Sequence, residues 1–209
     1  MVKKLRNLLG VRKIGHAGTL DPLASGLLLI GTGSKTKALT ALQGVDKWYK
    51  GDILLGKTTL SYDLETPLLD GNQGALAQCN KTMIAAAAAS FLGNTMQQPP
   101  AYSAIKVKGV AAYRKARQGK ATNLAPRPIT LHRFTITKLA LPIVSFEVCC
   151  SKGTYIRSLA HDFGIRLGCG GCLKSLVRTR VGHHRLEDAY SLETLFEKVK
   201  LKEKQSTAF

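Results

Sequence analysis

One carboxylate of this chain stands in a setting suited to catalysis. Asp21 lies in the stretch GHAGTLDPLASG, residues 15–26, where glycines permit unusual backbone angles and the close approach of a ligand. Pro22 biases Asp21 toward an extended conformation, so such a loop can present a single carboxylate on a rigid support. The same residues fit a simpler interpretation, in which Asp21 caps a helix that starts at Pro22. Taken alone, the stretch favours the cap.

Cysteine and histidine side chains raise a second possibility, a metal site. Cys169 and Cys172 form a CxxC pair, and His183 and His184 follow them in the sequence. A structural zinc site needs four ligands at workable spacing, and the adjacent cysteines at 149 and 150 make a poor second pair, so we expect no metal. Five cysteines, an odd number without a secretory signal, favour reduced thiols in a cytosol-like compartment.

The net charge of the chain indicates which kind of molecule it binds. The 209 residues contain 31 Lys and Arg against 13 Asp and Glu, a net charge of +18, and no acid occurs between Asp70 and Glu147. A field of one sign repels itself unless something negative binds to it, which favours RNA or DNA as the partner. The longest apolar stretch, Met83–Leu92, has about half of the ~20 residues that a membrane-spanning helix needs, so we expect no membrane partner.

Residue patterns predict the elements that must position these groups. Alternating aromatic and β-branched residues predict strands at 47–55, 129–136 and 143–150. Helical periodicity bounded by Asn or Gly predicts helices at 81–92, 110–118 and 154–167. No repeat or long linker divides the chain. We therefore expect one compact α+β domain at residues 1–201 and a loose tail at 202–209.

Five segments, in order, resemble a single family. The stretch GHAGTLDPLASG resembles the catalytic motif of the TruB family of tRNA pseudouridine synthases. The other four segments that look like family motifs are KWYK at 47–50 with its continuation to 59, QPPAYSAIKVKG at 98–109, KGTYIRSL at 152–159 and LVRT at 176–179. The resemblance runs from about Val2 to Leu195. It implies the pseudouridine synthase catalytic fold, a mixed and mostly antiparallel sheet flanked by helices.

The resemblance also implies an activity, the isomerisation of the T-loop uridine of tRNA (uridine 55) to pseudouridine. The reaction breaks the C1′–N1 glycosidic bond, turns the base and rejoins it through C5, without redox change or an added group. Asp21 is implied as the nucleophile, with attack at C1′ and other variants left open. Arg157 is implied as its ion-pair partner, although on sequence alone it could be a surface cation of a helix.

Further roles follow from the matched positions. Tyr49 is expected to stack on the target base near the point where a proton leaves C5, unless it merely packs in its strand. Because the uridine must be extruded from its loop, His16 is expected to fill the vacated space. Tyr155 is expected to wall the base pocket and Leu176 to close it from the apolar side.

RNA binding is expected to involve the basic residues of two matched segments. Lys106, which begins a basic run that ends at Arg133, is expected to contact phosphates, and Lys152 of KGTYIR is expected to bind substrate. No cofactor is implied. The partner is the T-arm stem-loop of tRNA, without a guide-RNA particle, and we predict a monomer located in the cytoplasm or in an organellar matrix or stroma.

The sequence also departs from the family pattern. Family members generally carry a strand and a K-P-x-G-x-T-S loop ahead of the part matched here, so we expect the chain to be truncated at its N-terminal end relative to the family. Many members also carry a C-terminal PUA domain, which we expect this chain to lack. Val177 replaces an expected arginine. Two alternatives therefore stay open. The first is a non-catalytic tRNA-binding or RNA-folding module, or an inactive fragment of such an enzyme. The second is a basic structural protein of a ribonucleoprotein particle.

Overall fold

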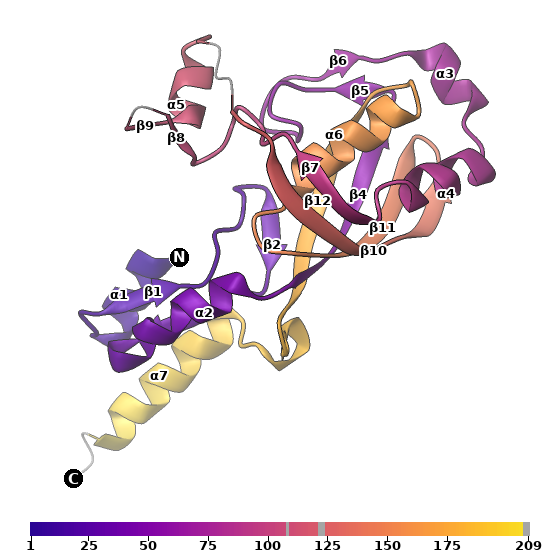
Figure 1. Cartoon of the computed structure of the whole chain (residues 1–209). Coiled ribbons are helices and arrows are strands. Elements are labelled where there is room, and N and C mark those ends of the chain that lie inside the picture. The colour runs from indigo at the N-terminus through magenta and orange to yellow at the C-terminus, as the bar shows by residue number, and fades with distance from the viewer. Residues whose placement is uncertain (108, 121–123, 207–209) are drawn as a thin grey trace.

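A single large sheet organises the molecule (Figure 1). The computed structural model describes residues 1–107, 109–120 and 124–206, with side chains described as far as Leu201. The sheet has seven strands, and all neighbours are antiparallel except β2 and β12. Its strands, in spatial order, are β13 (His184–Arg185), β12 (Gly171–Val181), β4 (Lys47–Leu55), β11 (Ile143–Cys150), β10 (Arg127–Ala140) and β7 (Gly93–Gln97), with β2 (Ala24–Gly26) beside β12.

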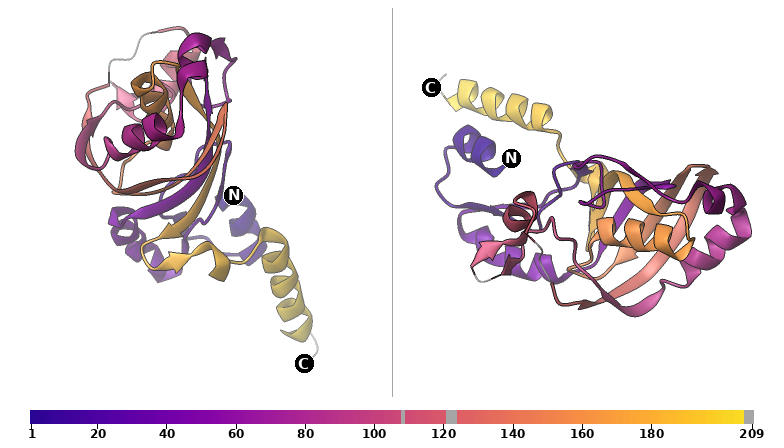
Figure 2. Two further views of the ribbon diagram at one scale, coloured as in Figure 1. Left: turned by 90° about the vertical axis from the view of Figure 1, so that its right-hand side faces the viewer. Right: turned by 90° about the horizontal axis from the view of Figure 1, so that it is seen from above.

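Alternation of side chains fixes which face of the sheet is buried. Along β4 the odd-numbered residues, such as Tyr49 and Ile53, point into the core, and the even-numbered residues Trp48 and Lys50 point to the other face. Two helices cover the core face, α4 (Lys81–Ala89) and α6 (Ile156–Arg166) (Figure 2), and α3 (Gln73–Gln78) lies at one end of the sheet (Figure 1).

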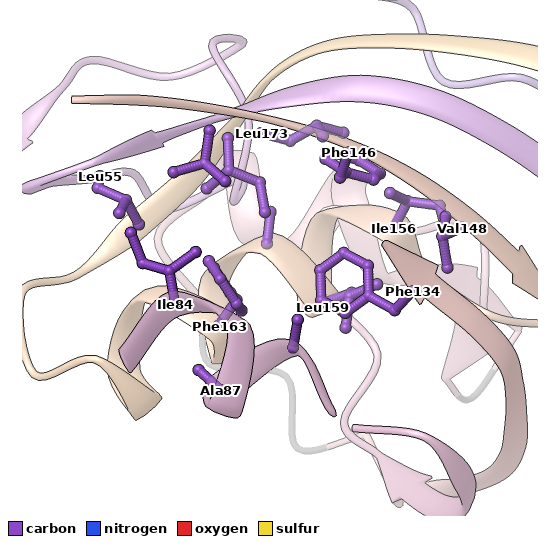
Figure 3. Close-up of a cluster of buried hydrophobic side chains, with 14 of the residues drawn as sticks. Leu55, Ile84, Ala87, Phe134, Phe146, Val148, Ile156, Leu159, Phe163 and Leu173 are labelled. Carbon is purple, nitrogen blue, oxygen red and sulfur yellow. The ribbon is translucent and has the colours of Figure 1, made fainter. Parts of the chain in front are cut away.

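Aromatic side chains dominate the core between α6 and the sheet (Figure 3). Phe134 of β10 lies edge-to-face with both Phe146 of β11 and Phe163 of α6, with ring centroids 5.7 and 5.5 Å apart. Burying each such side chain stabilises the fold by about 1.5–3 kcal/mol. Leu159, also on the buried face of α6, is 1% exposed. This packing fixes the start of α6, where the functional residues lie.

Two smaller parts extend from this body (Figure 1). Near the N-terminus, α1 (Val2–Leu9) precedes an antiparallel pair of strands, β1 (Ile14–His16) and β3 (Ile30–Thr32). After β3 the chain forms η1 (Gly33–Ala38) and then α2 (Leu39–Gly44). Between β7 and β10 the chain makes an excursion of β8 (Lys106–Val107), β9 (Val110–Ala111) and α5 (Ala112–Arg117). A further pair, β5 (Lys57–Thr58) and β6 (Leu69–Asp70), precedes α3.

Most predicted elements are confirmed. The strands predicted at 47–55 and 143–150 coincide with β4 and β11, and the one at 129–136 lies inside the longer β10. The predicted helices are shorter in the structure: α4 ends at Ala89, α6 spans Ile156–Arg166, and residues 110–111 form β9 before α5 begins. The interpretation of Asp21 as a helix cap is wrong, because the chain makes a turn after Asp21 and then pairs with β12 through β2.

The C-terminal part continues from the sheet through η2 (Leu186–Asp188) into α7 (Leu192–Ser206). Of the predicted tail at 202–209, residues 202–206 belong to α7, and 207–209 lie outside the described residues. Within the described part of the chain, no helix combines the length and apolarity needed to cross a membrane.

Candidate active site

A two-pronged ion pair joins the loop before β2 to the first turn of α6. The Arg157 guanidinium donates from Nε to Asp21 Oδ2 at 2.9 Å and from Nη2 to Oδ1 at 2.8 Å. Such a fork fixes the carboxylate in orientation as well as in position. The Asp21 side chain remains 32% exposed, whereas Arg157 is 3% exposed. The pair therefore presents one aimed carboxylate to a ligand, and Arg157 is not a surface cation.

Arg157 also contacts a second carboxylate, which the sequence analysis missed. Asp63 Oδ2 lies 3.7 Å from Arg157 Nε, and both side chains are 3% exposed. Arg157 Nη1 donates to the backbone carbonyl of Ser61 at 3.1 Å, and Asp63 Oδ1 accepts from the backbone N–H of Glu65. Buried Arg157 thus contacts two carboxylates, the partly exposed Asp21 and the buried Asp63.

The loop that carries Asp63 is shaped by local interactions. The hydroxyls of Thr59 and Ser61 both donate to the backbone carbonyl of Asp63, at 2.7 and 3.1 Å. Tyr62 has a positive φ of 65°, and its ring stacks on His161 of α6 with centroids 3.9 Å apart. The dense run of hydroxyl residues before one aspartate was the sequence signal for this turn, because Ser and Thr bond to nearby backbone.

A second buried arginine fastens the Asp21 loop to the sheet. Arg178 of β12 is 1% exposed and donates from Nε to the Leu27 carbonyl at 2.8 Å and from Nη2 to the Gly18 carbonyl at 3.1 Å. Gly26 lies so close to the backbone of Arg178 that a Cβ atom would collide with it. The LVRT segment pointed to this place, but sequence reasoning assigned a role there to Leu176 and not to Arg178.

Two tyrosines stand beside the ion pair. Burial, reinforced by the neighbouring Cys150, raises the pKa of Tyr49 to about 12, although the Arg178 guanidinium opposes the shift. Burial likewise raises the pKa of Tyr155, the residue before α6. The backbone of Tyr155 is gripped by Gln97, which accepts from its N–H at 2.8 Å and donates to its carbonyl at 3.0 Å. Both phenols are therefore neutral at neutral pH.

These groups line one pocket of about 650 Å³, within the usual range for ligand sites. The sequence-predicted residues that line it are His16, Asp21, Tyr49, Tyr155, Arg157 and Leu176. The other two do not line it: Lys106 lies exposed on β8, and Lys152 lies exposed in the turn before α6. The excursion between β7 and β10 contributes part of the wall, including Tyr113 and Arg117.

The lining of the pocket is basic. Its charged residues are Lys47, Arg117, Arg127, Arg157 and Arg178 against Asp21 and Glu65. Burial lowers the pKa of Lys47, whose Nζ donates to the carbonyls of Gln43 and Val45 at 2.6 Å each. An anionic substrate with a neutral aromatic part fits such a lining, since the cations attract phosphate and the tyrosine rings can stack on a base.

His16 is the last residue of β1, lies just before the loop that carries Asp21, and lines the same pocket. Its Nδ1 is buried and has no hydrogen-bond partner among the described residues. In the described ranges, no three His, Cys, Asp or Glu side chains gather as a metal ion requires.

Comparisons with known proteins identify the family of the chain. A model described as "TruB family pseudouridylate synthase (N terminal domain)" matches residues 6–156, and one described as "tRNA pseudouridylate synthase B C-terminal domain" matches residues 157–208. A tRNA pseudouridine synthase B of Flavobacterium johnsoniae is 49% identical over 185 residues, which are 88% of this chain and 80% of the relative. The protein of the same name from Chlorobium chlorochromatii is 45% identical over 204 residues, 95% of this chain and 79% of the relative.

The fold has counterparts among solved structures. A chain in the "Crystal Structure of a Cbf5-Nop10-Gar1 Complex" superposes with a TM-score of 0.73 at 25% identity over 98% of this chain. This chain spans 51% of that longer chain. The predicted α+β fold is confirmed by this likeness and by the sheet itself. Two family models that together span almost the whole sequence place the chain in the TruB family of pseudouridine synthases.

Proposed function

We propose that this chain is a tRNA pseudouridine synthase that isomerises the T-loop uridine, uridine 55, of tRNA. The observation that carries the proposal is the aimed Asp21 carboxylate in a basic, tyrosine-lined pocket. The reaction is an isomerisation in which C1′ exchanges its bond to N1 for one to C5, while a proton leaves C5 and N1 gains one. It needs no redox partner or carried group.

Asp21 acts as the nucleophile or electrostatic partner of the uridine, with attack at C1′ and other variants both compatible with its position. The fork from Arg157 keeps the carboxylate aimed, and Asp63 keeps Arg157 in place. Arg178 is a positioning residue, because it holds the backbone on both sides of the loop. This arrangement leaves little of the loop free to reorganise when the substrate binds.

Tyr49 supports the base. A phenol whose pKa is about 12 is a weak proton acceptor at neutral pH, which favours stacking over general-base catalysis. Tyr155 and Leu176 form walls of the same pocket. Extruding the uridine costs a few kcal/mol. Part of that cost is offset when His16 occupies the vacated stack and its buried Nδ1 gains an acceptor or donor from the RNA.

Phosphate contacts position the RNA without reading its sequence. The exposed Lys106 and Lys152 lie outside the pocket. We propose that they contact phosphates of the T-arm stem. We further propose that the chain acts alone on the T-arm stem-loop, as a monomer in the cytoplasm or an organellar matrix. A dimer in light scattering would contradict the monomer.

The test is release of tritium from tRNA transcribed with [5-³H]uridine, since isomerisation frees the C5 hydrogen. The wild-type chain should release one equivalent per tRNA, and Asp21→Asn should release none while binding tRNA with nearly unchanged affinity and salt dependence. Asp188→Asn removes an exposed carboxylate of η2 and should behave as wild type. Tight binding without release by the wild type would instead support the non-catalytic RNA-binding module.

A further inference from the structure

The face of the sheet opposite to α4 and α6 carries a row of side chains at matching register positions. Arg133 of β10 pairs with Cys149 of β11, Cys149 with Trp48 of β4, and Trp48 with Arg180 of β12. Arg180 in turn pairs with Arg185 of β13. Residues directly opposite each other in antiparallel strands point to the same face, so the three arginines share one face of the sheet with Trp48.

Trp48 and the three arginines line a second cavity of about 600 Å³. Lys50, two residues after Trp48, adds a fourth cation, and the two acids of the cavity are Glu147 and Glu187. The acids pair with Lys50 at 3.8 Å and with Arg185 at 3.1 Å. Four cations against two acids leave an excess of positive charge, which Arg133 and Arg180 carry without an acid of their own in the described part of the chain.

One like-charged pair in this row is unfavourable without an anion, although Arg185 pairs with Glu187 and Arg180 Nε donates to the Gly182 carbonyl at 2.6 Å. Arg180 and Arg185 stand directly opposite each other, and like charges in such a pair destabilise a sheet. The Arg133 guanidinium lies over the Trp48 ring, 5.8 Å from its centroid, and its Nε donates to the Thr135 hydroxyl at 3.1 Å. Phosphate oxygens between these arginines would relieve the repulsion, and the indole offers a surface on which an unpaired base can stack.

We propose that this face binds unpaired nucleotides of the substrate RNA that lie outside the T arm. The inference rests on the proposed function, because it assigns a second contact to the same tRNA. Trp48 lies between Lys47 and Tyr49, which line the catalytic pocket on the opposite face. A nucleotide bound at Trp48 therefore cannot be the uridine in the catalytic pocket. When the uridine of an isolated T-arm stem-loop is in that pocket, we do not expect the same stem-loop to reach Trp48 on the other face.

The chain contains one tryptophan, so its fluorescence reports this cavity directly. Titration with a full-length tRNA transcript should quench Trp48, whereas an isolated T-arm stem-loop, although it is a substrate, should not. Trp48→Leu should weaken the affinity for full tRNA about tenfold, within the range expected for one stacked base, and leave stem-loop affinity unchanged. Trp48→Phe keeps an aromatic ring and should restore most of the affinity.

Arg133→Gln should flatten the dependence of log affinity on log salt by about 0.7–0.9 with full tRNA alone, as expected for one lost phosphate contact. Lys138→Gln, an exposed cation of β10 outside the cavity, is the matched control and should change neither substrate's binding. Unfolding midpoints of all variants check that the fold is intact.

Equal quenching by both RNAs, or equal losses of affinity for both in Trp48→Leu, would overturn the inference. So would full activity and unchanged affinity of Trp48→Leu on the whole tRNA. These failures differ from failure of the proposed function, in which the wild type turns over neither RNA. Quenching by full tRNA that is lost in Arg133→Gln would then still support RNA binding at this face.

Discussion

Replacing Arg157 with methionine tests the buried charge network from the side of stability. The change removes three hydrogen bonds, two to Asp21 and one to the Ser61 carbonyl, and leaves Asp63 without its cation. Removing one partner of a buried ion pair costs roughly 3–5 kcal/mol. Asp21 contributes little to that cost because water reaches its side chain, which is 32% exposed. Most of the loss therefore falls on Asp63, which is 3% exposed.

A double-mutant cycle isolates this effect. Asp63→Asn keeps the shape of the side chain but removes its charge, so the double variant with Arg157→Met no longer buries an unpaired carboxylate. The double variant should be less destabilised than the sum of the single variants by about 1–3 kcal/mol, a coupling expected for residues in contact. Urea unfolding followed by circular dichroism measures each free energy of unfolding. Additive losses would refute the account of Asp63 as a partner of Arg157.

Three further predictions concern single positions. Tyr49→Phe should retain measurable tritium release, and its activity should follow the same pH profile as wild type between pH 6 and 9, because a phenol with a pKa of about 12 does not titrate there; a lost basic limb would contradict this. Gly26→Ala should lower the free energy of unfolding by about 1–3 kcal/mol or more, since Gly26 has a φ of 101° and its Cβ would strike the Arg178 backbone. Burial raises the pKa of Asp162 from 3.8 to about 6, so the folded protein binds this proton more tightly than the unfolded chain and stability falls as pH rises between those values. Asp162→Asn should flatten that fall and raise Tm at pH 7, and an unchanged Tm profile would count against it.

Local sequence signals were sufficient for the elements that carry the site. Period-two alternation placed β4 and β11 at their observed ends, and helical periodicity placed the buried face of α6. Helix ends were less well predicted. At residues 110–111, pairing of β8 with β9 takes precedence over helical propensity, so α5 starts two residues later than expected.

The parts that escaped prediction depend on contacts between distant segments. The local sequence around Asp21 resembles a helix cap. In the structure, parallel pairing of β2 with β12 extends the chain after Asp21, and this pairing joins residues about 150 positions apart in the sequence, so no local pattern indicates it. Asp63 and Arg178 were missed for a similar reason: each acts through a partner that only the tertiary fold brings near, Arg157 for the first and the Gly18 carbonyl for the second.

The row of arginines around Trp48 was hidden in another way. Arg133 was visible only as the end of a basic run, and Arg180 and Arg185 only as members of an overall basic composition. The register of five strands, together with bulges next to Arg133 and Arg180, is what aligns them on one face. Register over a whole sheet depends on packing that no short window of sequence contains.

Mapping of pseudouridine at nucleotide resolution tests whether Asp21 converts a uridine in the T loop. An unmodified tRNA transcript is incubated with the wild-type chain or with Asp21→Asn, treated with carbodiimide and copied by primer extension. The account predicts a single stop at the T-loop uridine with the wild type and none with Asp21→Asn. A stop at that uridine with both proteins, or no stop with a wild-type chain that binds tRNA tightly, would contradict it.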